Sequence, residues 1–170
     1  DLTVTGVQTC ALPISRFGVG FDTVDVEACK HAGIAVGITP NGVRRPVAVS
    51  VLTYILALSG KLLSKDALVR GGPSTFAQRA DHMGIGLVGK TLGSIGLGNI
   101  GAEVFRMCAP FGMNLIAHDP YIDPSTAKSV NVELRDLETV FRESDFLTLN
   151  VPLNERSEER RVGKECRSRW

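Results

Sequence analysis

The chain has 170 residues, of which 44% are hydrophobic and 22% charged, so a disordered or fibrous protein is excluded. Its formal net charge is +1 and only 6% of its residues are aromatic, so we expect no nucleic-acid partner. No run of about 20 uninterrupted apolar residues occurs, so we also expect no membrane span. The four cysteines lie too far apart for a CxxC metal site and no secretory signal is visible, which favours a metal-free protein of the reducing cytoplasm.

The two ends differ from the interior. Residues 156–160 can be encoded by AGA TCG GAA GAG followed by C, and residues 11–15 by GCT CTT CCG ATC followed by T. These two strings are reverse complements, as an adapter ligated to both ends of a DNA fragment would be, and both resemble a translated short-read sequencing adapter. We therefore expect residues 1–15 and 156–170 to be adapter-derived and to take no part in the fold.

Without these ends the weak positive charge disappears. The tail holds six of the 19 basic and three of the 18 acidic residues, and Asp1 lies in the head, which leaves 13 basic and 14 acidic residues. Two cysteines remain, Cys29 and Cys108. Both fall in expected helices, where we interpret them as buried, unreactive thiols.

The first half of the interior predicts two helices and a short strand. A helix over residues 24–32 with Gly33 as its C-cap is followed by a strand over residues 34–38. The turn at residues 39–42 is a candidate domain boundary. Pro46 can begin a long helix that ends at Gly71, Gly72 and Pro73. Its apolar spacing predicts one continuous buried face, formed by Val47, Val51, Tyr54, Ile55, Leu58 and Leu62.

The second half predicts strands at residues 91–95, 114–118 and 146–150, separated by helices at residues 99–111 and 134–143. On the first of these helices one face carries Ile100, Val104, Met107, Cys108 and Phe111. Alternating strands and helices with short connections indicate a parallel sheet with right-handed crossovers.

A glycine motif, GLGNIG, links the first of these strands to its helix. Asp119 stands 18 residues after the last glycine, at the end of the next strand, and this context makes the motif a strong dinucleotide-binding signal. Gly96 permits the tight turn, Gly98 lets the backbone approach a pyrophosphate, and Gly101 allows close packing of helix and strand. The N–H groups of Asn99 and Ile100 then face the phosphates.

The cofactor expected at this motif is NAD. The Asp119 carboxylate would accept hydrogen bonds from the ribose hydroxyls and repel the additional phosphate of NADP. No Arg or Lys occurs at residues 120–124 to receive that phosphate. His118, which precedes Asp119, is expected to point to the other face of its strand and to have a structural role.

The interior resembles the D-isomer-specific 2-hydroxyacid dehydrogenases, the family that includes phosphoglycerate dehydrogenase. The segments that carry the resemblance are RFGVGFDTVD at 16–25, GIAV at 33–36, TPNG at 39–42, GKTLG at 89–93, the GLGNIG turn, FGM at 111–113 and DPY at 119–121. The resemblance implies an α/β fold with a Rossmann-type parallel sheet, of which the first β-α-β-α-β half is present. It assigns residues 16–40 to the remnant of a substrate-binding domain and residues 41–155 to an incomplete NAD-binding domain.

The resemblance also implies an activity: hydride transfer between NAD and C2 of a D-2-hydroxy or 2-keto acid, in an enzyme that forms a homodimer when intact. Backbone N–H groups of the loop at Val19 and Gly20 would bind the substrate carboxylate, with Arg16 nearby. Val151 and Pro152 would contact the cofactor. The catalytic arginine, acidic residue and histidine of the family would lie beyond Glu155, so no catalytic residue is assigned and the chain by itself is expected to be inactive.

Two other functions stay open. Relatives of this fold serve as NAD-sensing corepressors, and the glycine turn alone does not distinguish sensing from turnover. Another Rossmann enzyme, such as a hydrolase of the adenosylhomocysteine type, is a further alternative that the loop at residues 16–25 disfavours.

Overall fold

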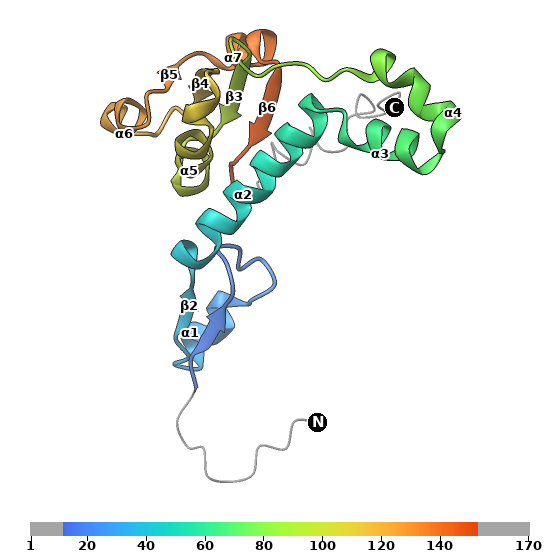
Figure 1. Ribbon diagram of the computed structural model, residues 1–170. Coiled ribbons are helices and arrows are strands. Elements are labelled where there is room, and N and C mark those ends of the chain that lie inside the picture. Colours follow the sequence, from blue (N-terminus) through green and yellow to red (C-terminus); the bar gives the residue numbers. More distant parts are fainter. Residues whose placement is uncertain (1–11, 153–170) are drawn as a thin grey trace.

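The computed structural model describes residues 12–152, which form a small N-terminal unit, a long helix and a larger sheet unit (Figure 1). The small unit contains strand β1 (Ile14–Arg16), helix α1 (Val26–His31) and strand β2 (Val36–Ile38). The two strands pair in parallel, with Ile14 opposite Val36. The predicted helix and strand of this unit are confirmed, with shorter bounds.

Strand β1 begins inside the head that the sequence analysis set aside. Ile14 donates its backbone N–H to the Ala35 carbonyl at 2.8 Å, and Ser15 lies opposite Gly37. The expectation that residues 1–15 take no part in the fold is therefore wrong for Ile14 and Ser15. A parallel ladder is made by backbone groups, so residues of any origin with an extended backbone can continue it. Leu12 and Pro13 belong to no helix or strand, and the other residues of the expected adapter-derived ends, 1–11 and 156–170, lie outside the described residues.

Helix α1 has a defined beginning and end. The Asp25 side chain accepts a hydrogen bond from the Ala28 N–H at 2.9 Å, which caps the N-terminus. At the other end Gly33 has φ +68°, and the Ile34 N–H donates to the Cys29 carbonyl at 2.8 Å. This is the hydrogen bond of a Schellman motif, so the predicted stop at Gly33 is confirmed, with Gly33 one residue past the cap.

The long helix α2 (Pro40–Ser59) starts six residues earlier than predicted. Pro40 occupies the first turn, which Pro46 was expected to fill, and Pro46 lies inside the helix. A proline rule based on the first turn fits both positions equally well. The residues between the two prolines include Arg44 and Arg45, which form ion pairs with Glu103 of α5 (Asn99–Cys108), so packing against another helix favours the earlier start.

The prediction of one helix as far as Gly71 is also wrong. Lys61 has φ +50°, a left-handed conformation that interrupts the helix and separates α2 from α3 (Leu62–Arg70). The expected single buried face splits accordingly: Ile55 is buried, whereas Tyr54 is 68% and Leu62 57% exposed. Two short helices follow, α4 (Pro73–Phe76) and the 3-10 helix η1 (Ala77–His82).

Among the described helices, α2 alone is long and apolar enough, by length and composition, to cross a membrane. Core helices of other proteins meet the same criterion. Here the helix carries Arg44 and Arg45 near its start and packs through Ala48 and Ile55 into the core.

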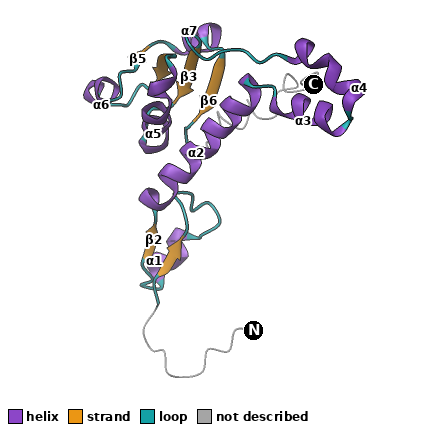
Figure 2. Ribbon diagram, in the orientation of Figure 1, coloured by secondary structure: helices purple, strands orange, loops and turns teal. Residues whose placement is uncertain are grey.

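The sheet unit has four parallel strands in the order β5-β4-β3-β6 (Figure 1 and Figure 2). Its elements in chain order are β3 (Thr91–Ile95), α5 (Asn99–Cys108), η2 (Ala109–Phe111), β4 (Asn114–His118), α6 (Pro124–Ser129), β5 (Glu133–Leu134), α7 (Leu137–Glu143) and β6 (Phe146–Leu149). The predicted α/β class and parallel sheet are confirmed. Helix α6 and the short strand β5 were not predicted, and α7 begins three residues later than predicted.

Apolar side chains between the sheet and helices α5 and α2 form the core. The largest fully buried side chains are Phe105, Leu92, Leu97, Val104, Val140 and Cys108. The predicted inner face of α5 is confirmed, with Val104 and Cys108 fully buried and Ile100, Met107 and Phe111 packed against the core. On the other face of β3, Gly93 lies against Val140 and Ser144, at and just after α7, so helices cover both faces of the sheet.

We expect the substitution Phe105→Ala to lower the free energy of unfolding by about 3–5 kcal/mol, because a fully buried ring is removed and a cavity remains. The matched control is Leu63→Ala, since Leu63 is 82% exposed on α3 and its loss should change stability by less than about 0.5 kcal/mol. Urea unfolding followed by circular dichroism measures both. Equal losses in the two variants would contradict the core described above.

Candidate nucleotide-binding site

The turn between β3 and α5 needs glycine at its first motif position. Gly96 has φ +89°, and a Cβ placed on it would lie 2.5 Å from the Asn150 carbonyl oxygen. The Gly96 N–H donates to the His118 carbonyl at 2.9 Å, which joins the turn to β4. The turn therefore sits between the ends of β4 and β6, and the predicted role of Gly96 in a tight turn is confirmed.

The other two motif glycines meet different surroundings. A Cβ on Gly101 would lie 2.6 Å from the Gly96 carbonyl oxygen and 3.5 Å from the Ser94 hydroxyl of β3, so the predicted close packing of helix and strand is confirmed. Gly98 is exposed, and a Cβ there would meet nothing within 4 Å. The space in front of Gly98 is thus open, as the approach of a pyrophosphate requires.

Helix α5 begins directly at this open space, with Gly98 as its N-cap. The N–H groups of Asn99 and Ile100 lie in the first turn, where an α-helix offers no intrahelical acceptor. Asn99 is exposed, whereas the Ile100 side chain packs against the core, so Ile100 presents only its backbone to a ligand. Exposed N–H groups and the positive end of the helix dipole fit a phosphate.

Asp119 follows β4 and supports the glycine turn directly. Its Oδ2 accepts a hydrogen bond from the Leu97 N–H at 2.8 Å, and its Oδ1 accepts one from the Tyr121 N–H at 3.0 Å. Each carboxylate oxygen keeps a further lone pair for a ligand hydroxyl. The ligand role of Asp119 was predicted from the sequence, whereas its hydrogen bond to Leu97 was not, because nothing in the spacing indicates that contact.

Two polar residues that were not predicted as site residues, Ser94 and Asn150, support the turn through hydrogen bonds. The buried Ser94 hydroxyl donates to the Gly96 carbonyl at 2.7 Å and accepts from the Asn150 side-chain amide at 3.0 Å. The available signal was a lone serine in an apolar strand, two residues before the motif. Val151 and Pro152 follow Asn150 and are exposed, and the Val151 side chain lies beside Gly96.

The expected substrate loop forms a second group of contacts in the N-terminal unit. Arg16 donates through Nε to the Gly20 carbonyl at 3.1 Å, and Val19 is 45% exposed. Thr39 holds the loop, since its hydroxyl accepts from the Gly18 N–H at 2.8 Å. The contacts described for this loop lie within residues 16–43, so they do not link Arg16, Val19 and Gly20 to the glycine turn.

The remaining reactive side chains have structural surroundings. Cys29 and Cys108 are buried, and burial raises the pKa of the Cys108 thiol to about 11, so the prediction of buried thiols is confirmed. The His118 ring contacts the Arg135 carbonyl through Nδ1 at 3.1 Å, in line with its expected structural role. Within residues 12–152 no group of three or more His, Cys, Asp or Glu could hold a metal ion.

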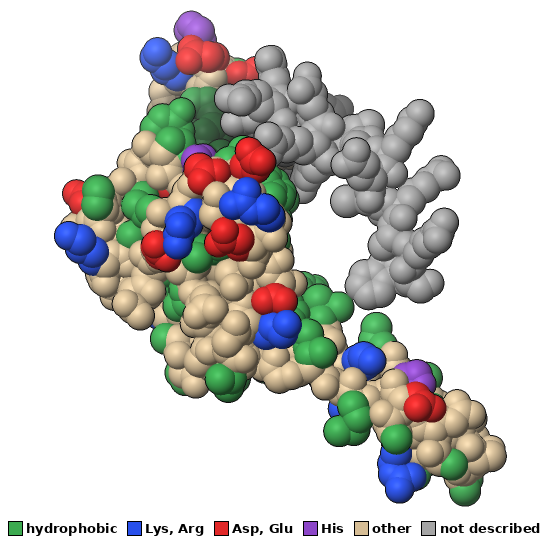
Figure 3. Space-filling model, turned by 90° about the horizontal axis from the view of Figure 1, so that it is seen from above, with side chains coloured by type: hydrophobic (Ala, Val, Ile, Leu, Met, Phe, Trp, Pro, Cys, Tyr) green, Lys and Arg blue, Asp and Glu red, His purple; other side chains and the backbone are tan. Residues whose placement is uncertain are grey.

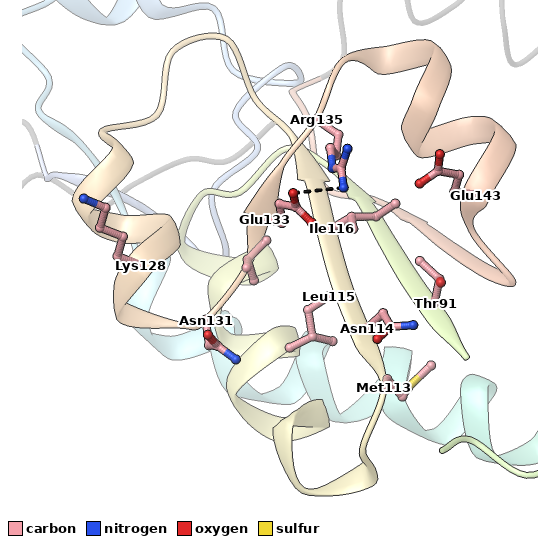
Figure 4. Close-up of a pocket in the computed structure, with 11 residues that line it drawn as sticks. Thr91, Met113, Asn114, Leu115, Ile116, Lys128, Asn131, Glu133, Arg135 and Glu143 are labelled. Carbon is pink, nitrogen blue, oxygen red and sulfur yellow. Dashed lines mark ion pairs between the residues drawn. The ribbon is translucent and has the colours of Figure 1, made fainter. Parts of the chain in front are cut away.

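A hollow of about 680 Å³ lies elsewhere on the sheet unit, along β4 and β5 (Figure 4). Glu133 and Arg135 form an ion pair of 2.9 Å on its wall, and Lys128 and Glu143 line it from α6 and α7. None of the residues predicted to bind a nucleotide is among those that line it. The glycine turn is the better candidate site, because its open space, N–H groups and carboxylate are of the kinds that a dinucleotide requires.

Residues 52–161 match the model of the D-isomer specific 2-hydroxyacid dehydrogenase NAD binding domain. The chain belongs to this family. The match includes the glycine turn and Asp119, so NAD is the cofactor of the domain. It ends at residue 161, within the segment that the sequence analysis assigned to the tail and outside the described residues.

Curated relatives agree with this family. The chain is 41% identical over 141 residues to D-3-phosphoglycerate dehydrogenase of Methanocaldococcus jannaschii, covering 82% of this chain and 26% of the relative. It is 40% identical over 142 residues to hydroxypyruvate reductase of Thermotoga maritima, covering 84% of this chain and 44% of the relative. The chain therefore spans between about a quarter and a half of the length of these relatives.

Solved structures show the same fold. The apo-structure of D-lactate dehydrogenase from Escherichia coli superposes with a TM-score of 0.69 at 32% identity, over 84% of this chain and 45% of that one. D-lactate dehydrogenase with NAD+ from Lactobacillus jensenii gives a TM-score of 0.72 at 27% identity, over 87% of this chain and 43% of that one.

Two glycine substitutions separate the folding and binding roles of the turn. Gly96→Ala should destabilise the chain by more than about 1 kcal/mol, because alanine is strained at φ +89° and its Cβ meets the Asn150 carbonyl. Gly98→Ala should leave stability nearly unchanged, since its φ of −70° suits alanine and its surroundings are open.

NAD binding should reveal a separate role for Gly98, whose substitution is expected to leave stability nearly unchanged. The methyl group of Gly98→Ala would occupy the space in front of the helix N-terminus, so NAD affinity should fall although the fold persists. Thermal unfolding and NAD titration by calorimetry measure the two effects. A Gly98→Ala variant that binds NAD as tightly as the unchanged chain would remove Gly98 from the binding site.

Proposed function

We propose that the chain is the NAD-binding part of an oxidoreductase that transfers hydride between NAD and C2 of a D-2-hydroxy or 2-keto acid. The observation that carries this proposal is the open glycine turn with the Asp119 carboxylate beside it, at the carboxyl ends of parallel strands. The printed names of the relatives, which include phosphoglycerate, hydroxypyruvate and glyoxylate enzymes, support a small 2-hydroxy or 2-keto acid as the substrate class.

In this proposal the chain binds and orients the cofactor. The N–H groups of Asn99 and Ile100 hold the pyrophosphate, the Asp119 carboxylate accepts from the ribose hydroxyls, and Val151 and Pro152 contact the cofactor at the end of β6. Bound NAD supplies the hydride chemistry. Because Asp119 also braces Leu97, ribose recognition and the shape of the phosphate turn depend on one carboxylate.

The substrate would be bound by the loop of the N-terminal unit. The backbone N–H groups of Val19 and Gly20 can donate to a substrate carboxylate. Arg16 supplies a positive charge beside them, and its Nε is held by a hydrogen bond to the Gly20 carbonyl. Thr39 fixes the shape of the loop from the start of α2. The His118 ring contacts the Arg135 carbonyl, so we assign His118 no acid or base role.

We also propose that the intact enzyme is a cytoplasmic homodimer. An apolar surface on α2 and α3 supports a dimer, because Tyr54 is 68%, Leu58 50% and Leu63 82% exposed there. A surface of this kind needs cover from more chain or from a second subunit. Acidic and basic side chains are intermixed on the face shown in Figure 3, which suits a small-molecule enzyme better than a nucleic-acid binder.

The contribution of Asp119 is testable by substitution. Removing a hydrogen-bonded charged group costs roughly 1.5–3 kcal/mol, so Asp119→Ala should weaken NAD binding about 10- to 150-fold and narrow the preference over NADP. Asp123→Asn is the control, because Asp123 caps α6 and asparagine caps equally well. Paired titrations with NAD and NADP give the result, and an unchanged preference in Asp119→Ala would exclude Asp119 from the site.

Turnover separates the enzyme from the NAD-sensing alternative. The 170-residue chain should give no NADH production or consumption above a blank with a panel of 2-hydroxy and 2-keto acids, because no acid or base is assigned to the site among residues 12–152, and such a group is worth about 10²–10⁴-fold in rate. A longer protein of the same family that contains residues 16–152 should turn over at least one member of the panel. Such a protein that binds NAD and turns over none would favour the sensor.

A further inference from the structure

Three arginines surround the buried carboxylate of Glu103 on α5. The Glu103 side chain is 8% exposed, and Arg45 reaches its Oε1 at 3.3 Å from the second turn of α2. Arg106, one turn further along α5, lies 3.3 Å from Oε2, and Arg44 lies 3.8 Å from the same oxygen. Three guanidinium groups from two helices therefore converge on a single carboxylate.

Positive charge is in excess at this cluster. Three arginines and one glutamate leave a local charge of +2. The four side chains line a hollow of about 530 Å³, together with Met107 and Pro110. No other charged residue is among those that line it, so Glu103 neutralises only one of the three arginines.

One donor of the cluster lacks an acceptor. Arg44 Nε is buried, and among the described side chains it has no hydrogen-bond partner, since 3.8 Å to Glu103 is too long for a hydrogen bond. A buried N–H without an acceptor is unfavourable, and in folded proteins such a group commonly meets a water or an ion. Excess charge, a hollow and an unpaired donor thus coincide at one place.

We propose that this hollow binds a small phosphate dianion, either inorganic phosphate or a phosphate monoester group, between α2 and α5. Guanidinium groups pair with phosphate through two donors each, and a tetrahedral anion can accept from three arginines that approach from different helices. The charge of a dianion matches the local +2. The site is separate from the glycine turn, since residues 96–101 contribute none of its lining.

A bound anion would link the two units of the chain. Arg44 and Arg45 lie in the helix that leaves the N-terminal unit, and Glu103 and Arg106 lie in the helix that begins at the glycine turn. A bound phosphate would offset the repulsion among the three arginines, because all three could donate hydrogen bonds to the same anion. The inference does not depend on the proposed function, because it uses none of the residues assigned to NAD or substrate.

The test is a titration of the full 170-residue chain with sodium phosphate at constant ionic strength, followed by NMR of the arginine Nε–Hε groups and of the backbone amides. Saturable shifts are expected at Arg44, Arg45 and Arg106. Shifts confined to the amides of Asn99 and Ile100 would place phosphate at the glycine turn and overturn the proposal, as would the absence of saturable shifts at the arginines.

Substitutions give the second readout. Arg45→Gln and Arg106→Gln should each weaken phosphate binding about tenfold, the change that corresponds to roughly 1.4 kcal/mol. Arg142→Gln is the control, because Arg142 is an exposed arginine on α7 outside the cluster, and it should leave the affinity unchanged. Equal phosphate affinity in the unchanged chain, Arg45→Gln and Arg106→Gln would overturn the proposal.

Removal of the acid gives an opposite effect. Glu103→Gln raises the local charge from +2 to +3, so phosphate should bind more tightly and should restore thermal stability lost through arginine repulsion. Arg142→Gln again serves as the reference. Weaker phosphate binding in a folded Glu103→Gln variant, as judged by its circular dichroism spectrum, would contradict the charge argument.

Discussion

The close approach of Gly101 to the Gly96 carbonyl is the contact on which the sheet unit depends. Because a Cβ at residue 101 would lie 2.6 Å from that oxygen, α5 can start next to the strand it follows only if glycine stands there. This contact aims the N-terminus of α5 at the open space beside Gly98. The same contact lets Val104 and Cys108 reach the core against β3 and β4. The ligand site and the hydrophobic core therefore share one geometric requirement.

Hydrogen bonds from polar side chains hold the glycine turn in one conformation. Ser94, Asn150 and Asp119 each hydrogen-bond to the turn or to a neighbour of it, from three different strand ends. A six-residue turn with three glycines has high conformational freedom, so it keeps one shape only if such bonds restrain it. In this way the affinity of the site for a dinucleotide comes partly from residues that need not touch it, since a preformed site spends less binding energy on ordering.

Helix α2 has two unlike faces, and both follow from its position. Its inner residues, such as Ala48 and Ile55, pack in the core. Arg44 and Arg45, near its start, form ion pairs with the Glu103 carboxylate of α5. Its outer residues, such as Tyr54 and Leu58, remain exposed. A buried carboxylate is costly unless paired, and Glu103 pairs with Arg44 and Arg45, which joins the start of α2 to α5. The helix thus joins the N-terminal unit to the cofactor helix and leaves an apolar surface free.

The sequence by itself determined the sheet unit and its ligand. Strands at residues 91–95 and 114–118, the inner face of α5 and the roles of Gly96 and Gly101 could all be predicted, because each depends on local periodicity or on a backbone conformation that only glycine adopts readily. Tertiary structure alone decided the rest. Pro40 rather than Pro46 begins α2, Lys61 breaks the expected long helix, and Ile14 joins β1, because packing and backbone pairing choose among options that local rules leave equal. The bracing of Leu97 by Asp119 and the approach of Arg44 and Arg45 to Glu103 also lie beyond sequence spacing, since they join residues 22 to 59 positions apart that only the folded chain brings together.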